Sequence, residues 1–197
     1  MLTWTDKYDL PDCELELRKG WLTQDEADAL FEELVRDVEW ETKKLWMFGK
    51  WIDQPRLTAF YGDAGKKYHY TGSDWQAKQW LPGMEMVRDR IKSEYGMEMN
   101  SVLCNHYRNG SDSVGWHTDG GGADGLNPQI FSLSLGAARD FQIKHNTLAS
   151  HSLRTIKLGH GSLLYMGGTM QSHWKHQVPK VVSSGPRINL TFRAVVG

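Results

Sequence analysis

The sequence predicts an α+β fold that is mainly β, in which helices precede a β-sandwich or jelly roll. Hydrophobic residues recur at helical spacing in two segments before Gly96 and at every second position in the runs after it. The connections after Gly96 are short and rich in glycine, and no long helical segment separates the strands, which disfavours a doubly wound parallel sheet. With 197 residues and 40% hydrophobic content, the chain is expected to form one domain with a substantial core.

The N-terminal half contains the two predicted helices. The first 20 residues mix apolar and acidic side chains with a proline, and we interpret them as an irregular lead-in. Thr23 and Glu26 form a capping-box pattern, and the apolar residues after them predict a helix that ends in the late thirties. A second helix is expected from the low eighties to Tyr95, where Gly96 is a stop signal. Both helices are interpreted as scaffold.

Strands are predicted after Gly96, where short runs of alternating apolar and polar residues are separated by turn residues. The predicted strands are Ser101–Tyr107, Ile130–Leu135, Phe141–Lys144, Arg154–Leu158, Ser162–Met166 and Ile188–Val196. Strands at this spacing are typical of a sandwich or jelly roll. We therefore expect residues 1–197 to form a single domain, with an extension at about 1–95 and the β core at about 96–197.

The composition restricts the function. The 23 Lys and Arg residues nearly balance the 24 Asp and Glu residues, so a nucleic-acid partner would have to be bound by local basic clusters and aromatic side chains. The two cysteines, Cys13 and Cys104, are far apart and do not indicate a disulfide framework. The sequence shows no secretory signal and no apolar run of roughly 18 residues, so we expect an intracellular protein without a membrane span.

His117, Thr118 and Asp119 form the most informative local motif. In extended backbone, the first and third side chains of an H-x-D triplet point to the same side, so one metal ion could bind both. His176, much later in the chain, is the candidate third ligand. Two histidines and one carboxylate on one face of Fe(II) leave three coordination positions open. On its own, such a triplet more often consists of exposed polar side chains that bind no metal. If Asp119 is a metal ligand, we expect it at an accessible site and not in the core.

A polar face on the last predicted strand strengthens the metal interpretation. Alternation places four side chains on one side of it: Arg187, Asn189, Thr191 and Arg193. At the mouth of a jelly roll, two guanidinium groups would be natural partners for a dicarboxylic cosubstrate.

Together, the H-x-D triplet, the later histidine and the R-x-N-x-x-x-R run resemble the AlkB-like Fe(II)- and 2-oxoglutarate-dependent dioxygenases. The resemblance covers nearly the whole chain from about Trp46 and includes Phe48–Trp51, Pro55-Arg56, Tyr61–Gly65, Asn105–Tyr107, Ala138–Phe141, His160–Leu164 and Pro186-Arg187. It is strongest to members that repair alkylated double-stranded DNA. It implies a double-stranded β-helix (jelly roll) with N-terminal helices and a hairpin extension that recognises the substrate. The implied activity is oxidative demethylation of bases such as 1-methyladenine and 3-methylcytosine, with Fe(II), 2-oxoglutarate and O2.

The resemblance also implies the roles of individual residues. The implied iron ligands are His117, Asp119 and His176. The implied ligands of the distal carboxylate of 2-oxoglutarate are Asn105, Tyr107 and Arg187, and the residues nearer the iron are Asn189, Thr191 and Arg193. Asn105 and Tyr107 share one face of their strand, which agrees with a common ligand. His106, between them, is interpreted as a packing residue.

A substrate-binding set is implied in the N-terminal half: Phe48, Gly49, Lys50, Arg56, Tyr68, His69 and Tyr70. In duplex-repairing relatives, the finger that corresponds to Phe48 fills the gap left by a flipped nucleotide. Tyr70 is expected to stack on the flipped base opposite His117. The residues expected to bind phosphates are Lys43, Lys44, Lys50, Arg56, Lys66 and Lys67. Without the resemblance, Phe48 would be assigned to a hairpin core.

One departure leaves the base selectivity open. Relatives that act on DNA bases usually follow the H-x-D carboxylate with further acidic residues that contact the base amino group. Here Asp119 is followed by Gly120, Gly121 and Gly122, and Asp124 is the next acid.

Alternative functions remain at this stage. The same iron chemistry would serve an RNA demethylase or a protein hydroxylase, and a jelly roll without catalysis could be a binding module. The finger argues against a protein substrate, and the intact triad and arginine pair argue against a binding module. The expected partner is alkylated DNA, with RNA as the alternative. The protein is expected to act as a monomer, in the cytoplasm of a bacterium or the nucleus of a eukaryote.

Overall fold

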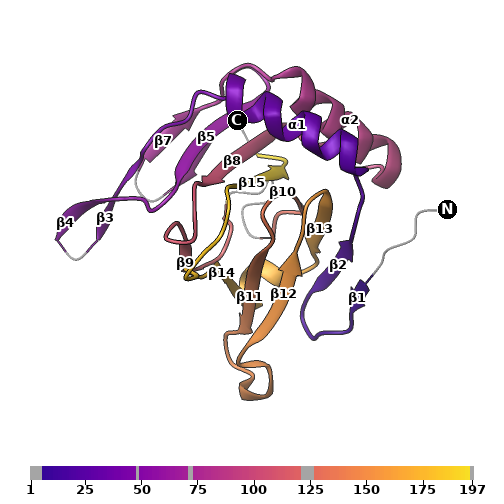
Figure 1. Ribbon diagram of the computed structural model, residues 1–197. Coiled ribbons are helices and arrows are strands. Elements are labelled where there is room, and N and C mark those ends of the chain that lie inside the picture. Colours follow the sequence, from indigo (N-terminus) through magenta and orange to yellow (C-terminus); the bar gives the residue numbers. More distant parts are fainter. Residues whose placement is uncertain (1–5, 48, 71–72, 121–126, 196–197) are drawn as a thin grey trace.

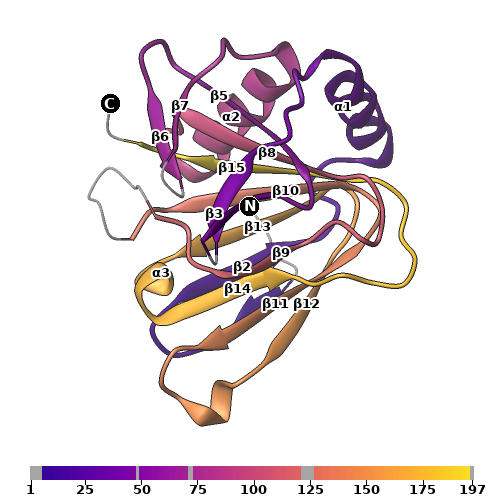
Figure 2. The ribbon, with the colours of Figure 1, turned by 90° about the vertical axis from the view of Figure 1, so that its left-hand side faces the viewer.

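The computed structural model describes residues 6–47, 49–70, 73–120 and 127–195. Two β-sheets face each other, and two helices cover the outer face of the larger sheet (Figure 1). Figure 2 shows the smaller sheet on the opposite side of the larger one from the helices. The prediction of a mainly β jelly roll with N-terminal helices is confirmed.

The larger sheet is antiparallel, with the strand order β1-β2-β13-β10-β15-β8-β5. Its strands are β1 (Asp6–Tyr8), β2 (Glu14–Arg18), β5 (Leu57–Gly62), β8 (Ser101–Tyr107), β10 (Ile130–Gly136), β13 (Ser162–Gly167) and β15 (Arg187–Arg193). Strands from both halves of the chain therefore lie in one sheet.

The smaller sheet has the order β12-β11-β14-β9. Its strands are β9 (Val114–His117), β11 (Arg139–His145), β12 (Arg154–Leu158) and β14 (Trp174–Val178). Two hairpins form separate two-stranded sheets: β3 (Lys44–Met47) with β4 (Lys50–Asp53), and β6 (Lys67–Tyr70) with β7 (Ser73–Gln76). The remaining short elements are the 3-10 turn η1 (Ala149–His151) and the helix α3 (Met170–His173).

The two long helices follow the local signals in the sequence. Helix α1 (Gln24–Asp37) begins after the reciprocal capping box of Thr23 and Glu26. Helix α2 (Pro82–Tyr95) begins with a proline and ends at Gly96, whose φ of 68° lies in the left-handed region that favours glycine. Both predicted helices are confirmed. In the described ranges, no helix has the length and apolar character needed to cross a membrane.

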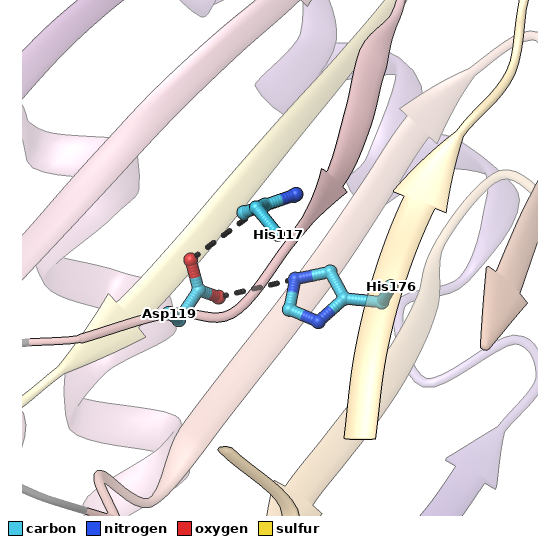
Figure 3. A group of neighbouring side chains, drawn as sticks. All are labelled: His117, Asp119 and His176. Atoms are coloured by element: carbon cyan, nitrogen blue, oxygen red, sulfur yellow. Dashed lines mark ion pairs between the residues drawn. The ribbon is translucent and has the colours of Figure 1, made fainter. Parts of the chain in front are cut away.

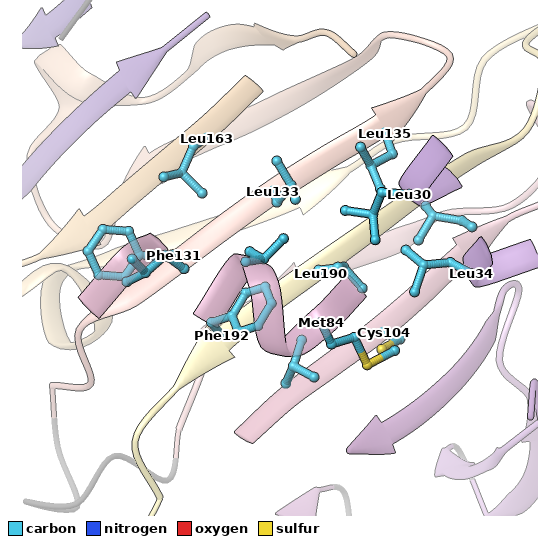
Figure 4. Packing of buried hydrophobic residues seen from close by; sticks show 14 of the residues in the cluster. Leu30, Leu34, Met84, Cys104, Phe131, Leu133, Leu135, Leu163, Leu190 and Phe192 are labelled. Atoms are coloured by element: carbon cyan, nitrogen blue, oxygen red, sulfur yellow. The ribbon is translucent and has the colours of Figure 1, made fainter. Parts of the chain in front are cut away.

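The larger sheet divides the interior into two layers. On its outer side, α1 and α2 pack on apolar residues of β8, β10, β13 and β15 (Figure 4). On its inner side, a second apolar cluster fills part of the space between the sheets. Because both faces are covered, β15 is buried along its whole length, including its polar side chains. The candidate site is built from the polar residues of this inner face.

The interpretation of the first 20 residues as an irregular lead-in is wrong. Strand β2 pairs with β13 and so extends the larger sheet. Leu15 and Leu17 are each only 1% exposed, and they alternate with charged residues along β2. This period of two favours a strand with one buried face.

The other strand predictions need smaller corrections. Strands β9 and β14 are not among the strands that the alternation predicts. Strand β15 ends at Arg193, before the predicted end at Val196. The reason lies in Asn100, whose side chain accepts from the backbone N–H of Val195 and donates to its carbonyl, so these groups do not continue the β ladder.

Candidate active site

His117, Asp119 and His176 converge between the two sheets (Figure 3). His117 is the last residue of β9, and it lies directly opposite His176 in the antiparallel pairing with β14. Asp119 follows in the loop after β9. Its Oδ1 is 3.8 Å from His117 Nε2 and its Oδ2 is 3.6 Å from His176 Nε2. Among the residues that the structure describes, this is the one His, Cys, Asp and Glu group with metal-site geometry.

His117 and Asp119 are in the protonation states that a metal ion requires. His117 Nδ1 lies 2.8 Å from the carbonyl oxygen of Gly115, so this nitrogen carries the proton and Nε2 keeps its lone pair. Burial, and to a smaller extent the neighbouring His176, lower the pKa of His117 to about 4. Burial alone would raise the pKa of Asp119, but Arg193 and the two histidines hold it well below its usual range. A neutral imidazole therefore faces a charged carboxylate.

The spacing of these groups also fits a bound cation. The two imidazole–carboxylate distances are longer than good hydrogen bonds. Two imidazoles and one carboxylate, all within 4.8 Å of one another, form a donor set that suits Fe(II).

Asp119 lies in the interior, only 6% exposed, so the expectation of an accessible position is wrong. Its backbone N–H donates to Oε1 of Gln171 at 2.8 Å. Gln171 is in α3, immediately before β14, so this bond connects the loop of one metal-ligand candidate to the strand of another. The packing of the smaller sheet, which no local pattern reveals, buries this carboxylate.

Arg187 and Tyr107 form the other end of the site. They lie directly opposite each other in the pairing of β15 with β8, and each is at most 2% exposed. The Arg187 guanidinium carbon is 5.1 Å from the centre of the Tyr107 ring, and Nη2 donates to Oγ of Ser134 at 2.9 Å. Its Nε and Nη1 are buried without a hydrogen-bond partner among the described residues. Because arginine stays charged, this guanidinium fits an anionic ligand.

The other predicted residues of β15 are fixed between the two ends. Asn189 donates to Oγ of Ser132 at 2.8 Å and to the carbonyl of Leu133 at 3.1 Å, and its own amide oxygen accepts from Thr191. Arg193 places its Nη2 3.7 Å from Oδ1 of Asp119. The strand therefore presents a continuous polar face from the carboxylate-binding end to the metal-binding end.

The prediction that Arg56 binds phosphates does not fit its position, because Arg56 lies buried inside this site. It is 4% exposed, and its Nε donates to Oδ1 of Asn105 at 2.7 Å. Pro55 precedes it, and neither residue type alone indicates burial. The pairing of β5 with β8 places this segment beside Asn105.

One cavity brings these residues together. Its polar lining consists of Arg56, Asn105, Tyr107, His117, Asp119, Ser132, His176, Arg187, Asn189 and Thr191. Its apolar lining consists of Leu103, Val114, Phe141, Met166 and Val178. Sequence reasoning missed Ser132, Ser134, Gln171 and Arg139. For the two serines, the signal was their alternation with leucine in a predicted apolar strand.

The predicted substrate-binding side is described only in part. Phe48 lies outside the described residues, as do the side chains of Tyr68, His69 and Tyr70 and the residues Gly121, Gly122 and Asp124. Gly49 forms the turn between β3 and β4 with a φ of 75°, and Lys50 beside it is exposed. The hairpin β3–β4 projects away from the two sheets (Figure 1).

Other predicted residues have the following contacts. Lys44 and Lys67 are exposed, whereas Lys43 pairs with Glu41 at 2.6 Å, which partly compensates its charge. His106 packs against Trp40, with ring centres 5.0 Å apart, so the prediction that it is a packing residue is confirmed.

Comparison with known proteins identifies the family. A model of the 2OG-Fe(II) oxygenase superfamily matches residues 14–193. The DNA oxidative demethylase ALKBH2 of Homo sapiens is 38% identical, over 94% of this chain and 74% of that protein. ALKBH2 of Bos taurus is 40% identical, over 87% and 65% respectively. The alpha-ketoglutarate-dependent dioxygenase alkB homolog 3 of Homo sapiens is 39% identical, over 91% and 65%. The chain thus spans about two thirds to three quarters of these relatives.

Solved structures support the fold independently. OsALKBH1 superposes with a TM-score of 0.63 at 17% identity, covering 95% of this chain and 98% of that one. An oxidoreductase of the 2OG-Fe(II) oxygenase family from Burkholderia pseudomallei gives 0.60 at 13% identity, covering 91% and 84%. The chain therefore belongs to the 2OG-Fe(II) oxygenase superfamily and is AlkB-like within it, and His117, Asp119 and His176 form a candidate site for the iron that this family uses with 2-oxoglutarate and O2.

Proposed function

We propose that this protein is an oxidative demethylase of N-alkylated bases in DNA, acting on lesions such as 1-methyladenine and 3-methylcytosine. The observation that carries the proposal is one cavity that holds two histidines and a carboxylate at one end and, at the other, a buried arginine without an ion pair among the described residues. The similarity to proteins named DNA oxidative demethylase supports DNA as the substrate. An intracellular, monomeric enzyme is proposed with it.

His117, Asp119 and His176 would hold Fe(II), with His117 coordinating through Nε2 because Nδ1 faces the Gly115 carbonyl. With iron and 2-oxoglutarate bound, the site would use O2 as the oxidant: one oxygen atom would enter succinate as 2-oxoglutarate loses CO2, and the other would hydroxylate an N-methyl carbon, which then leaves the base as formaldehyde. The apolar residues of the cavity, such as Phe141 and Val178, exclude water from the reacting atoms.

Arg187 and Tyr107 would bind the distal carboxylate of 2-oxoglutarate. The free Nε and Nη1 of Arg187 are the donors that a carboxylate needs for a two-point contact. Asn105 takes part through its Nδ2, since its amide oxygen already accepts from Arg56. In this arrangement Arg56 orients Asn105 and does not bind phosphate. Asn189, Thr191 and Arg193 line the side nearer the iron, where Arg193 keeps Asp119 ionised.

The hairpins β3–β4 and β6–β7 would form the DNA-binding side. We propose that Phe48 enters the base stack, with Gly49 and Lys50 at the turn of the same hairpin, and that Tyr68, His69 and Tyr70 contact the flipped base. The exposed Lys44, Lys50 and Lys67 would bind phosphates.

The test is formaldehyde release from methylated oligonucleotides. The protein is loaded with Fe(II) and 2-oxoglutarate without oxygen, and air is then admitted in the presence of single-stranded DNA, double-stranded DNA or RNA that contains 1-methyladenine. We expect release from DNA that depends on 2-oxoglutarate and is absent from the Asp119→Ala variant. Release from RNA alone would change the substrate class, and no release from any of the three would contradict the proposed function.

A further inference from the structure

Arg139, the first residue of β11, is a buried arginine that the proposed chemistry does not use. It is 1% exposed and forms none of the ion pairs found among the described residues. Its guanidinium donates instead to three backbone carbonyls: those of Asn109 at 3.3 Å, Asp112 at 2.9 Å and Pro179 at 2.5 Å. Neutral carbonyls satisfy Nη1 and Nη2 but do not cancel the charge of Arg139, and its buried Nε has no hydrogen-bond partner among the described residues.

The three carbonyls belong to two segments that border the site. Asn109 and Asp112 are in the turn between β8 and β9, and Pro179 directly follows β14. The two segments are joined by a bond from the N–H of Val181 to the carbonyl of Gly110 at 2.9 Å. A Cβ atom at Gly110 would lie 2.4 Å from the carbonyl oxygen of Val181, so this approach requires glycine. Arg139 thus connects the ends of strands that carry Tyr107, His117 and His176.

Arg139 also contacts the cosubstrate end of the cavity. Its guanidinium carbon lies 5.6 Å from the centre of the Tyr107 ring, and that of Arg187 lies 5.1 Å from the same ring. Burial lowers the pKa of Arg187, and the charge of Arg139 lowers it further. Two buried guanidinium groups therefore share one tyrosine.

The two carboxylates that act on Arg139 electrostatically, Asp112 and Asp140, each form a closer ion pair with another cation. Asp112 accepts from the backbone N–H, Nε and Nη2 of Arg108, at 2.8 to 2.9 Å. Asp140 pairs with Lys157 at 3.1 Å. In the described part of the chain, this end of the cavity therefore has an excess of positive charge that a ligand must balance.

We propose that Arg139 is a positioning residue that holds Tyr107 beside Arg187 and makes this end of the cavity select a cosubstrate with an anionic distal group. The inference rests on the proposed binding of 2-oxoglutarate by Arg187 and Tyr107. The selected class is a 2-oxo dicarboxylate, and the disfavoured class is a 2-oxo acid of similar length with a neutral end.

The test compares two ligands that differ at this end only. The ligands are 2-oxoglutarate and 2-oxopentanoate, which ends in a methyl group. Their Kd values are measured by calorimetric titration of the Fe(II)-loaded protein without oxygen. A displacement titration is used where binding is weak. For Arg139→Gln we expect 2-oxoglutarate to bind about tenfold more weakly and 2-oxopentanoate less than about twofold more weakly. Equal weakening of both ligands, or of neither, would overturn the proposal.

Two further variants separate charge from structure. Arg139→Lys keeps the charge but cannot reproduce the three carbonyl bonds, so it is expected to melt at a lower temperature while still discriminating between the ligands. If Arg139→Gln does not fold, Arg139→Lys becomes the decisive variant. Loss of discrimination between the two ligands in Arg139→Lys would overturn the role of the charge. Arg18→Gln is the matched control, since Arg18 pairs with Glu94 away from the cavity and its loss should leave the ligand ratio unchanged.

The same titration separates this inference from the proposed function. A wild-type protein that prefers 2-oxoglutarate through Arg139 but releases no formaldehyde would contradict the demethylase activity and still support the role of Arg139. A wild-type protein that does not discriminate between the two ligands would overturn the inference, whatever the enzyme demethylates.

Discussion

The two faces of strand β15 are equally buried but chemically opposite. Toward the helices it presents Ile188, Leu190 and Phe192, each 0% exposed. Toward the smaller sheet it presents Arg187, Asn189, Thr191 and Arg193, none more than 8% exposed. The helix face is an ordinary apolar core, whereas the inner face carries charges and amides that a core excludes unless they have partners. Burial alone therefore does not distinguish a core face from a site face. Buried polar groups without hydrogen-bond partners do distinguish them.

This difference predicts that substitutions on the inner side reduce function and that substitutions on the helix side reduce stability. The largest effect is expected for Asp119→Ala, which removes the anionic member of the candidate metal site. Turnover should fall by more than about a hundredfold, with loss of Fe(II) binding, because two imidazoles alone are a weak site. The fold should persist in circular dichroism, since Asp119 lines a cavity. Asp140→Ala, which removes a surface carboxylate, is the control, and near wild-type turnover of Asp119→Ala would refute the triad.

On the helix side, Leu190→Ala should cost about 2–5 kcal/mol of unfolding free energy, because Leu190 is fully buried and leaves a cavity. The folded protein should bind 2-oxoglutarate as before. Urea unfolding and calorimetric titration measure the two quantities. Leu153→Ala makes the same chemical change at a side chain that is 54% exposed and should cost less than about 0.5 kcal/mol. A large loss of cosubstrate affinity in Leu190→Ala would break the distinction between the faces.

Arg187→Lys tests the inner face without removing its charge. An ammonium group cannot form the two-point contact of a guanidinium, so the apparent Kd of 2-oxoglutarate should rise about ten- to hundredfold. Titration of activity and binding with Fe(II) held constant measures this change. An unchanged Kd would show that the cosubstrate binds elsewhere.

Phe48→Ala extends the comparison to the hairpin β3–β4. If Phe48 is a wedge, repair of double-stranded DNA should fall about tenfold more than repair of a single strand, because only the duplex must be held open against stacking. The ratio of the two rates is the measurement. Parallel losses on both substrates, with a lower melting temperature, would instead indicate a core role for Phe48.

The smallest effect concerns His106, a titratable residue that packs toward the helices. Burial lowers its pKa below the ordinary value of about 6.5. As pH falls through the ordinary pKa, His106 is protonated in the unfolded chain but stays neutral in the folded protein. The free energy of unfolding therefore decreases toward acid pH. His106→Gln should therefore lose less stability than the wild type between pH 7.5 and 5.5, as measured by urea unfolding. Equal losses in the two proteins would argue against this contribution.

Local patterns in the sequence predict much of this molecule. The capping box at Thr23, the stop at Gly96 and the alternation in β15 depend on residues close in sequence, and the structure confirms all three elements. The alternation of Leu15 and Leu17 carried the same kind of signal, but the short segment is surrounded by acidic residues and a proline. The family motifs predicted which residues would lie around the cavity.

The depth and partners of the site residues could not be predicted in the same way. Arg56 and Asp119 are buried because β5 pairs with β8 and because the smaller sheet covers the larger one. These contacts join segments far apart in the chain, and the residue types themselves are usually exposed. Gln171 and Arg139 hydrogen-bond to backbone groups of distant segments, so these contacts cannot be predicted from side-chain patterns, although Arg139 lies within the family-like run Ala138–Phe141.

The position of β9 at the rim of the smaller sheet has a consequence for dynamics. This strand pairs with β14 alone, and its ladder is irregular between His176 and Val178. An outermost strand with one short ladder is among the segments that open first in local unfolding, and hydrogen exchange detects such opening. A ligand that bridges His117 and His176 joins this strand to its neighbour and raises the free energy of that opening by an amount that grows with the ratio of ligand concentration to Kd. Amide exchange in β9 thus reports on occupancy of the site without any turnover.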